Sequence, residues 1–334
     1  MTSLALLLPV FPALGGNTTG NPAMHTPDGF LSATVAIAFW ILSLAVISYA
    51  LKRVNQDLGE RQVPLMGVLA ACIFAGQMLN FSVTGGTSGH LLGAAIATIL
   101  LGPWAAILVL TCVVGVQALI FQDGGLLALG ANIFNMAVVG VAVSYFTYRT
   151  IQKLAGSRSW GLLASGFAAG WLSIFIAALA CALQLALSGT SPANLAIPAM
   201  GGIHGLIGVG EGLITVGALA FLYSTRRDLI QAGSMRPVGG AAVWIAGLII
   251  ALALTVASPL ASIHPDGLEW VAEQQGFLHV AQQPLYMVIP DYVFPGIHDA
   301  ALATILAGIL GSLIVFGVAL GVAYTRRNRQ AASG

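Results

Sequence analysis

The segment Met24-His25-Thr26-Pro27-Asp28-Gly29-Phe30 lies directly before the first long apolar run of the chain, which extends to Leu51. Its Pro27-Asp28-Gly29 sequence is typical of a tight turn, because proline presets φ and glycine adopts backbone conformations that other residues resist. We therefore expect the turn to hold His25 rigidly at the outer end of the apolar segment that follows.

The same segment contains the nitrogen atoms that a metal site needs. If Met24 is the first residue, its amine, the amide nitrogen of His25 and the His25 imidazole can close two adjacent chelate rings on one metal ion. Three nitrogens in one plane suit Ni(II) or Cu(II), which favour square-planar or tetragonal nitrogen ligands. A fourth ligand would have to come from elsewhere in the chain. The alternative is an ordinary loop histidine.

The composition is that of a membrane protein. Of the 334 residues, 58% are hydrophobic and only 7% are charged, whereas soluble domains carry about 25% charged residues. Together with the long apolar runs, this predicts a polytopic helical membrane protein. A net charge of +1 argues against nucleic acid as a partner. Cys72, Cys112 and Cys181 each lie alone in an apolar run, so we interpret them as small core residues.

Apolar runs of spanning length repeat along the chain, and a shorter run at 90–101 is too short to cross a bilayer without tilt or local thinning. The longer runs lie at 30–51, 65–83, 103–121, 128–148, 160–187, 205–223, 239–258 and 300–324. The sequence therefore predicts an all-α polytopic membrane protein with about eight or nine transmembrane segments.

The distribution of charge predicts the orientation. Threading the runs with the N-terminus outside places every lysine and arginine in the cytoplasm, as the positive-inside rule requires. These are Lys52, Arg53, Arg61, Arg149, Lys153, Arg158, Arg226, Arg227, Arg236, Arg326, Arg327 and Arg329. The outer face then receives all six histidines and seven acids, which are His25, His90, His204, His264, His279, His298, Asp28, Asp123, Asp266, Glu269, Glu273, Asp291 and Asp299. We expect a cytoplasmic C-terminus and an outer face that attracts cations.

The chain divides into three parts by pattern. Residues 1–23 make a poor signal peptide, because no basic residue precedes their apolar run and prolines interrupt it. We expect this extension to be absent or removed, which would free the Met24 amine. Residues 24–228 form a bundle with short loops. Residues 229–334 contain two further spans around a long external loop at 259–299, and loops of that length are uncommon unless functional.

A second motif, Thr84-Gly85-Gly86-Thr87-Ser88-Gly89-His90-Leu91-Leu92-Gly93, leads into an apolar segment. Its glycines let backbones approach closely, and Thr87 and Ser88 can satisfy exposed amides or orient the imidazole. A histidine at a membrane-entry position is costly to bury without a partner, so a functional role for His90 is the default expectation. The alternative is a structural histidine.

Three more motifs complete the pattern: Gly102-Pro103-Trp104, Gln117-Ala118-Leu119-Ile120-Phe121-Gln122-Asp123-Gly124-Gly125 and Gly130-Ala131-Asn132-Ile133-Phe134-Asn135-Met136. From residue 24 to about 228 the chain closely resembles the CbiM/NikM family, the substrate-binding components of cobalt and nickel energy-coupling-factor (ECF) transporters. In that family the metal is held by the N-terminal amine, the amide and imidazole nitrogens of the second residue, and one later histidine. The resemblance implies Met24, His25 and His90 as the metal ligands here. The upstream extension departs from the family pattern.

The sequence Pro265-Asp266-Gly267-Leu268-Glu269 resembles the small NikN subunit of nickel transporters. The chain thus resembles a fused NikMN protein, and both this fusion and the planar nitrogen set favour Ni²⁺ over Co²⁺. Acids and histidines of the external loop can concentrate cations or steer loading of the main site, or can simply be solvated. They are Asp266, Glu269, Glu273, His264, His279 and His298.

Four further residues lie near the outer ends of two spans: Gln117, Asp123, Asn132 and Asn135. We expect them to hydrogen-bond to residues 24–30 and hold that loop over the site, although each can instead cap a helix. Glu211 is an acid inside a span and must be paired, neutral or in a polar cavity. We interpret it as a structural donor; a place in the bundle interior near His204 is the alternative.

The resemblance also implies partners. They are a transmembrane coupling subunit of the CbiQ/NikQ type and ATPases of the CbiO/NikO type, in the cytoplasmic membrane of a bacterium or archaeon, with the divalent metal as cargo and no prosthetic group. The chain has no GxxxxGK[ST] loop, so ATP hydrolysis is expected in separate subunits, and the chain itself is not expected to be an enzyme. An intramembrane metal-dependent enzyme would require an HExxH motif, which is absent. A non-transporting metal sensor would require a cytoplasmic output domain, and the inner loops are too short for one.

Overall fold

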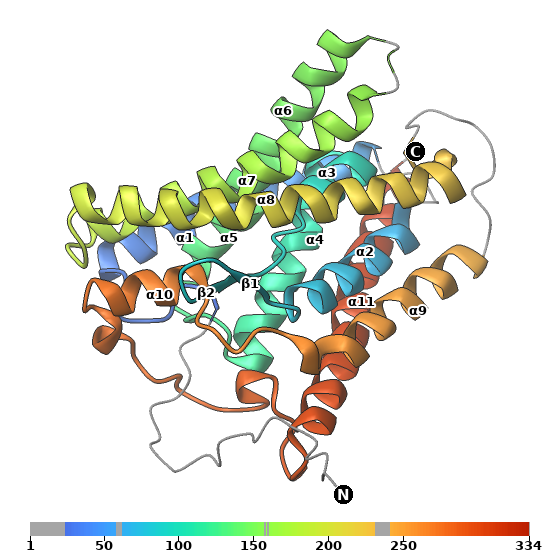
Figure 1. The fold of residues 1–334 in the computed structure, drawn as a ribbon. Coiled ribbons are helices and arrows are strands. Elements are labelled where there is room, and N and C mark those ends of the chain that lie inside the picture. The colour runs from blue at the N-terminus through green and yellow to red at the C-terminus, as the bar shows by residue number, and fades with distance from the viewer. Residues whose placement is uncertain (1–23, 58–61, 157, 159, 231–240, 334) are drawn as a thin grey trace, which may run out of the picture.

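The computed structural model describes residues 24–57, 62–156, 158, 160–230 and 241–333. The expected N-terminal extension at 1–23 lies outside the described residues, as does most of the polar linker between the two larger parts. Almost all secondary structure in the described chain is helical (Figure 1). The longer helices are α1 (Ala33–Asp57), α2 (Gln62–Gln77), α3 (Ala94–Leu101), α4 (Pro103–Val116), α5 (Leu129–Ile133), α6 (Gly140–Ala155), α7 (Trp160–Leu187), α8 (Ala193–Thr225), α9 (Ala241–Ala257), α10 (Gly267–Gln274) and α11 (Ala300–Ser333).

Short turns of other helix types extend these elements. Two are π-helical, η1 (Gln117–Phe121) after α4 and η2 (Phe134–Val139) between α5 and α6. Four are 3₁₀-helical: η3 (Arg227–Leu229), η4 (Ser258–Leu260), η5 (Leu278–Val280) and η6 (Pro290–Tyr292). Single-turn π segments inside helices are frequent near functional sites; η1 ends two residues before Asp123, and η2 contains Asn135.

Six helical segments of the described chain are long and apolar enough to cross a bilayer. They are Ala33–Val54, Pro103–Phe121, Leu129–Ala155, Trp160–Leu187, Ala193–Thr225 and Ala300–Thr325, and two shorter apolar helices lie at Val63–Gln77 and Trp244–Leu260. The chain is thus a multi-pass membrane protein. Helix α3 has eight residues, about 12 Å of helix at 1.5 Å per residue, so the run at 90–101 is indeed too short to cross a hydrocarbon core of about 30 Å.

The expected span at 65–83 is wrong at its C-terminal end. Helix α2 stops at Gln77, and β1 (Phe81–Val83) pairs antiparallel with β2 (Thr87–Gly89) in a two-stranded hairpin. Gly85 and Gly86 form the turn with positive φ values of 94° and 79°, a conformation that glycine adopts without steric cost. The apolar residues of β1 continued the helical run in the sequence because periodicity alone does not separate a short strand from a helix end.

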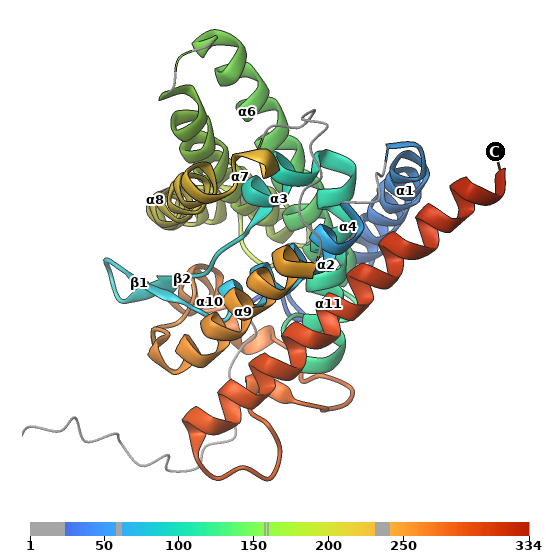
Figure 2. The same cartoon turned by 90° about the vertical axis from the view of Figure 1, so that its right-hand side faces the viewer.

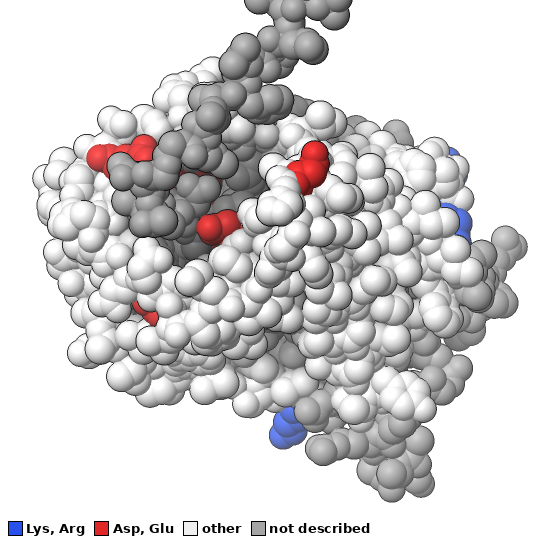
Figure 3. Space-filling model, turned by 90° about the horizontal axis from the view of Figure 1, so that it is seen from below, with Lys and Arg blue, Asp and Glu red and all other residues white. Residues whose placement is uncertain are grey.

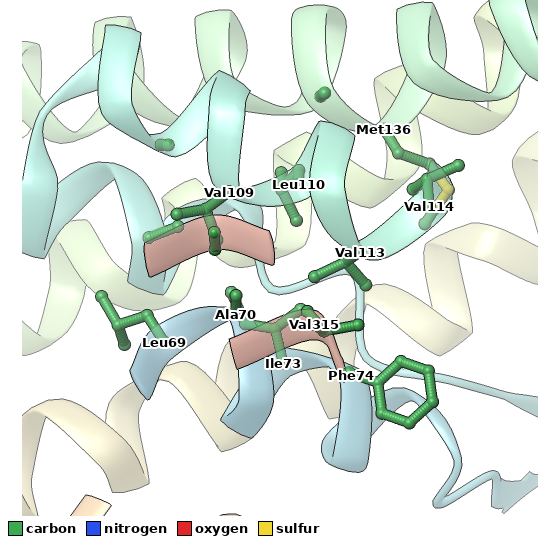
Figure 4. Packing of buried hydrophobic residues seen from close by; sticks show 14 of the residues in the cluster. Leu69, Ala70, Ile73, Phe74, Val109, Leu110, Val113, Val114, Met136 and Val315 are labelled. Atoms are coloured by element: carbon green, nitrogen blue, oxygen red, sulfur yellow. The ribbon is translucent and has the colours of Figure 1, made fainter. Parts of the chain in front are cut away.

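The described helices form two groups that meet at α4. Helices α6, α7 and α8 pack together on one side, and α2, α9 and α11 pack together on the other (Figures 1 and 2). Figure 4 shows the core between them, where Phe74 of α2 and Val315 of α11 lie against Val113 of α4. The second part of the chain therefore packs on the first through its two apolar helices.

The long loop of the second part returns to the first part through backbone hydrogen bonds. The nitrogen of Ser262 donates to the Asn80 carbonyl at 2.8 Å, and the nitrogen of Ser88 donates to the Pro265 carbonyl at 2.8 Å. Further along, the nitrogen of Gln282 donates to the Asp28 carbonyl at 2.7 Å. Ser88 and Asp28 belong to the motifs at 84–93 and 24–30, and Asn80 lies four residues before the first of these. The fold therefore brings the loop onto the candidate site.

Candidate metal site

The loop at 24–30 is held as its turn sequence predicts. Gly29 has a φ of +94°, and a Cβ atom there would collide with the carbonyl oxygen of Val280. The two carboxylate oxygens of Asp28 accept hydrogen bonds from the backbone nitrogens of Leu126 and Ala128, at 3.0 and 2.9 Å. The turn is therefore fixed both to the segment before α5 and to the loop of the second part.

Asn132 of α5 holds the residue that follows the candidate ligand His25. Its side-chain oxygen accepts from the Thr26 nitrogen at 3.1 Å, and its side-chain nitrogen donates to the Thr26 carbonyl at 3.0 Å. These two hydrogen bonds hold both the backbone N–H and the carbonyl of Thr26. This residue therefore holds the 24–30 loop, in keeping with the role expected for it.

Asp123 contacts both the backbone and the ring of His25. The His25 amide donates to Oδ1 of Asp123 at 3.2 Å, and Nδ1 of the ring lies 3.2 Å from the same oxygen. The other carboxylate oxygen accepts a hydrogen bond of 2.5 Å from the hydroxyl of Tyr292, which belongs to η6 in the second part. The two His25 nitrogens that the resemblance implies as ligands thus share one carboxylate oxygen.

His90 lies against His25, although 65 residues separate them in the chain. Their ring centroids are 5.4 Å apart in an edge-to-face arrangement. Nδ1 of His90 is 3.1 Å from the Leu91 carbonyl and so carries the proton in the favourable tautomer. Its Nε2 is thereby left free as a lone-pair donor, and this atom lies 4.0 Å from Oδ2 of Asp266.

A small cavity of about 80 Å³ lies between these rings and the helices α7 and α8. Its wall includes Met24, His25, His90 and Asp266. Nε2 of His25 is buried and has no hydrogen-bond partner among the described residues. A buried nitrogen without a partner is costly in a folded protein, and its place beside this cavity fits a site that accepts a cation.

The pKa values follow from burial and from the pairing of charges. Burial alone would lower the pKa of His25, but the adjacent Asp123 carboxylate outweighs it and the net pKa is raised. Burial alone would raise the pKa of Asp123, but the His25 charge outweighs it and the net pKa is lowered. Burial, then the His25 charge, lowers the pKa of His90 to about 4, so this ring is neutral and can bind a metal. Burial raises the pKa of Asp266 to about 8.

Four of the expected supporting residues have other partners. The hydroxyls of Thr87 and Ser88 donate to carbonyls of the second part, at Pro265 (3.1 Å) and His264 (2.9 Å) respectively. The Asn135 amide pairs with Gln184 of α7 at 2.8 and 2.7 Å. The Gln117 amide is buried beside the hydroxyl of Tyr292, although it makes no hydrogen bond of normal length among the described residues. None of these four side chains has a described hydrogen bond to the 24–30 loop or to the His90 ring.

Glu211 holds a backbone segment through hydrogen bonds, but it accepts these bonds where we expected it to donate them. Its two carboxylate oxygens accept from the backbone nitrogens of Leu92 and Gly93, at 2.6 and 3.0 Å. These amides precede α3 and would otherwise be unsatisfied at a helix start. The carboxylate therefore holds the segment that follows His90.

Sequence reasoning missed three residues at this site. Tyr292, which bonds to Asp123, gave no signal because it lies 169 positions away in the chain. His204 and Cys181 both line the small cavity, and their isolation in apolar runs made them indistinguishable from core residues. Within the described chain, no group of three or more His, Cys, Asp or Glu side chains has the arrangement of a metal site. Nitrogens of the backbone or chain terminus would have to complete any site here.

A larger cavity of about 490 Å³ lies outside the small one. It is lined by five acids, Asp123, Asp266, Glu269, Glu273 and Asp291, and also by Met24. Figure 3 shows acidic side chains around a hollow on the face seen from below, and lysine and arginine near the edge of that view. The acids of the second part therefore lie beside the candidate ligands and not on a distant solvated loop.

The fold and site define a multi-pass membrane protein in which two adjacent imidazoles lie near an acidic cavity that shares Met24 and Asp266 with theirs. The family model described as the cobalt uptake substrate-specific transmembrane region, CbiM, matches residues 25–229, and the PDGLE domain model matches residues 241–328. The chain belongs to the CbiM family of nickel and cobalt transport proteins, with a PDGLE domain fused behind it.

Relatives along the whole chain carry the same fusion. A protein of Archaeoglobus fulgidus assigned as a fused nickel transport protein NikMN is 39% identical over 92% of this chain and all of its own length. The fused nickel transport protein NikMN of Rhodobacter capsulatus is 31% identical over 91% of this chain and 99% of its own. A crystal structure described as a transition metal transporter is 36% identical, with a TM-score of 0.54, and covers 60% of this chain and 92% of its own.

Proposed function

We propose that this chain is the substrate-capture component of an ECF-type importer for a divalent transition metal, with Ni²⁺ favoured over Co²⁺. The observation that carries the proposal is the contact between His25 and His90, whose rings lie 5.4 Å apart beside a cavity of about 80 Å³. The names of the relatives support a nickel or cobalt cargo, and the fused relatives are named for nickel.

The proposed ligands are the Met24 amine, the amide and ring nitrogens of His25, and Nε2 of His90. Four nitrogens near one plane match the geometry that Ni(II) prefers. Asn132 supports the set because it fixes the residue that follows His25, as residues behind metal ligands commonly do, whereas Asp123 holds the His25 nitrogens until the metal displaces it. In this account residues 1–23 are absent from the working protein, because an acylated Met24 nitrogen is no longer an amine.

We place the N-terminus and the acidic hollow outside the cell and the C-terminus in the cytoplasm. The basic residues support this topology, since the threading that puts all of them inside follows the positive-inside rule. The expected partners are a CbiQ/NikQ-type coupling subunit and CbiO/NikO-type ATPases, because the chain has no phosphate-binding loop of its own.

The site is tested by elemental analysis of protein purified after growth with nickel. Wild-type protein should carry about one nickel per chain, and His25→Ala and His90→Ala should each carry almost none, since each removes a proposed ligand. The matched control is His279→Ala, an exposed loop histidine, which should load as wild type does. Full nickel content in either of the first two variants would refute the site.

The orientation is tested by cysteine labelling in intact cells. Gln283→Cys lies on the external loop and Lys153→Cys at the end of α6, and both positions are exposed. A membrane-impermeant maleimide should label the first in intact cells and the second only after permeabilisation. The reverse pattern would overturn the topology.

A further inference from the structure

Asp266 occupies a particular place between the two cavities. It lines both the outer cavity of about 490 Å³ and the inner cavity of about 80 Å³. Its side chain is only 4% exposed, and its backbone pairs with Ser88 of β2 through an isolated parallel bridge. A carboxylate from the PDGLE domain is thus built into the wall of the CbiM-type site.

The two oxygens of Asp266 have different surroundings. Oδ1 caps α10 by accepting from the Glu269 nitrogen at 2.8 Å. Oδ2 faces His90, at 4.0 Å from Nε2. That distance is too long for a hydrogen bond, and it is about twice the roughly 2.0–2.2 Å bond that a divalent metal makes to an imidazole nitrogen or a carboxylate oxygen. A cation between the two atoms would contact both.

A second buried polar atom near the inner cavity has no partner. Nε2 of His25 is buried without a partner in the described chain, and the His25 side chain is 4% exposed. This ring lines the same inner cavity as Asp266 and His90. The other acids of the second part that line the outer cavity, Glu269, Glu273 and Asp291, do not line the inner one. Asp266 is therefore distinguished from the surrounding acids by its access to the inner ligands.

We propose that Asp266 is itself a metal-binding residue, which receives the divalent cation from the outer cavity and holds it against Nε2 of His90 as the nitrogens of residues 24–25 close around it. This inference rests on the proposed function. The fused domain would then bind the metal directly through Asp266, in addition to raising the concentration of cations near the site. The cargo then has a fifth contact atom available, an oxygen, in addition to the four nitrogens.

The test uses the full chain in detergent, with Ni²⁺ alone as the probe in a competition titration. Asp266→Asn keeps the cap of α10, because asparagine caps helices as well as aspartate does, and it replaces the carboxyl oxygen that faces His90 with an NH₂ group. We expect its Ni²⁺ affinity to fall by about 10- to 100-fold, with a shift in the ligand-field absorption of the bound nickel. The matched control, Glu273→Gln, removes the same charge from an exposed position of the outer cavity and should leave both readouts close to wild type.

Three results would overturn the proposal. If Asp266→Asn keeps wild-type affinity and spectrum while His90→Ala loses nickel, Asp266 is no ligand but the proposed site stands. If Asp266→Asn and Glu273→Gln weaken binding equally and leave the spectrum unchanged, the carboxylate acts by charge alone. If His90→Ala also binds nickel normally, the proposed site itself is wrong and this inference falls with it.

Discussion

At the scale of single residues, the site is organised by carboxylates that hold nitrogens. Oδ1 of Asp123 accepts from the amide and the ring of His25, and Oδ2 accepts from Tyr292. A metal that binds these two nitrogens must displace Asp123 from both of them, so the carboxylate holds His25 in place until the metal arrives. The hydrogen bond to Tyr292 also joins the fused domain to the residue that fixes His25.

Tyr292→Phe tests that link. The substitution removes the hydroxyl and leaves a buried carboxylate oxygen without its donor, so the free energy of unfolding should fall by about 1–3 kcal/mol. The thermal midpoint in detergent measures this loss. Tyr286→Phe is the control, because Tyr286 donates to the Leu119 carbonyl from a more exposed position. An equal shift in both variants would show that the Asp123 contact has no special role.

The pH dependence of metal binding follows from the raised pKa of His25. A raised pKa means that the proton is held more tightly than on a free imidazole, and a metal must displace it to bind the ring. Affinity for Ni²⁺ should therefore fall as the pH falls through the His25 pKa, which lies above the ordinary value of 6.5. Loss of the His25 amide proton acts in the same direction. Titrations between about pH 8 and about pH 6 that give a constant affinity would count against both nitrogens as ligands.

At the scale of elements, α8 holds the start of α3 through Glu211. The carboxylate accepts from the Leu92 and Gly93 nitrogens, two and three residues after His90. Glu211→Gln keeps one acceptor oxygen but places an NH₂ group against the second amide, so the protein should lose about 1–3 kcal/mol of stability. Because Glu211 does not line the inner cavity, the nickel content of the protein that remains folded should stay near wild type. Loss of nickel at unchanged stability would assign Glu211 to the site instead.

Some of the helices could be predicted from the sequence, and the hairpin could not. The spans around α1, α4 and α7 were predictable because each is a long apolar run with turn residues at its ends. The hairpin of β1 and β2 was not, because the Phe81–Val83 side chains are as apolar as those of a helix end and their pairing depends on the turn at Gly85. The partners of Thr87 and Ser88 were missed for a related reason, since they lie in the fused domain, 176 to 178 positions away.

At the scale of the whole molecule, the fused domain closes over the first bundle. Its helices α9 and α11 pack on α2, and its loop contributes Tyr292 and Asp266 to the surroundings of the two histidines. The motif pattern resembles a known family closely enough to propose Met24, His25 and His90 as metal ligands, and this stays a prediction. A contact between distant parts of the chain leaves no trace in one sequence. The placement of Asp266 therefore emerged only from the fold.

The proposed nitrogen plane depends on one further property of the whole chain, a free amine at Met24. Native mass spectrometry of the nickel-loaded protein measures the mass of the chain and its metal content in the same spectrum. The account predicts that the chains that carry nickel have the mass expected for a protein that starts at Met24. A population that retains residues 1–23 and carries nickel equally well would contradict it.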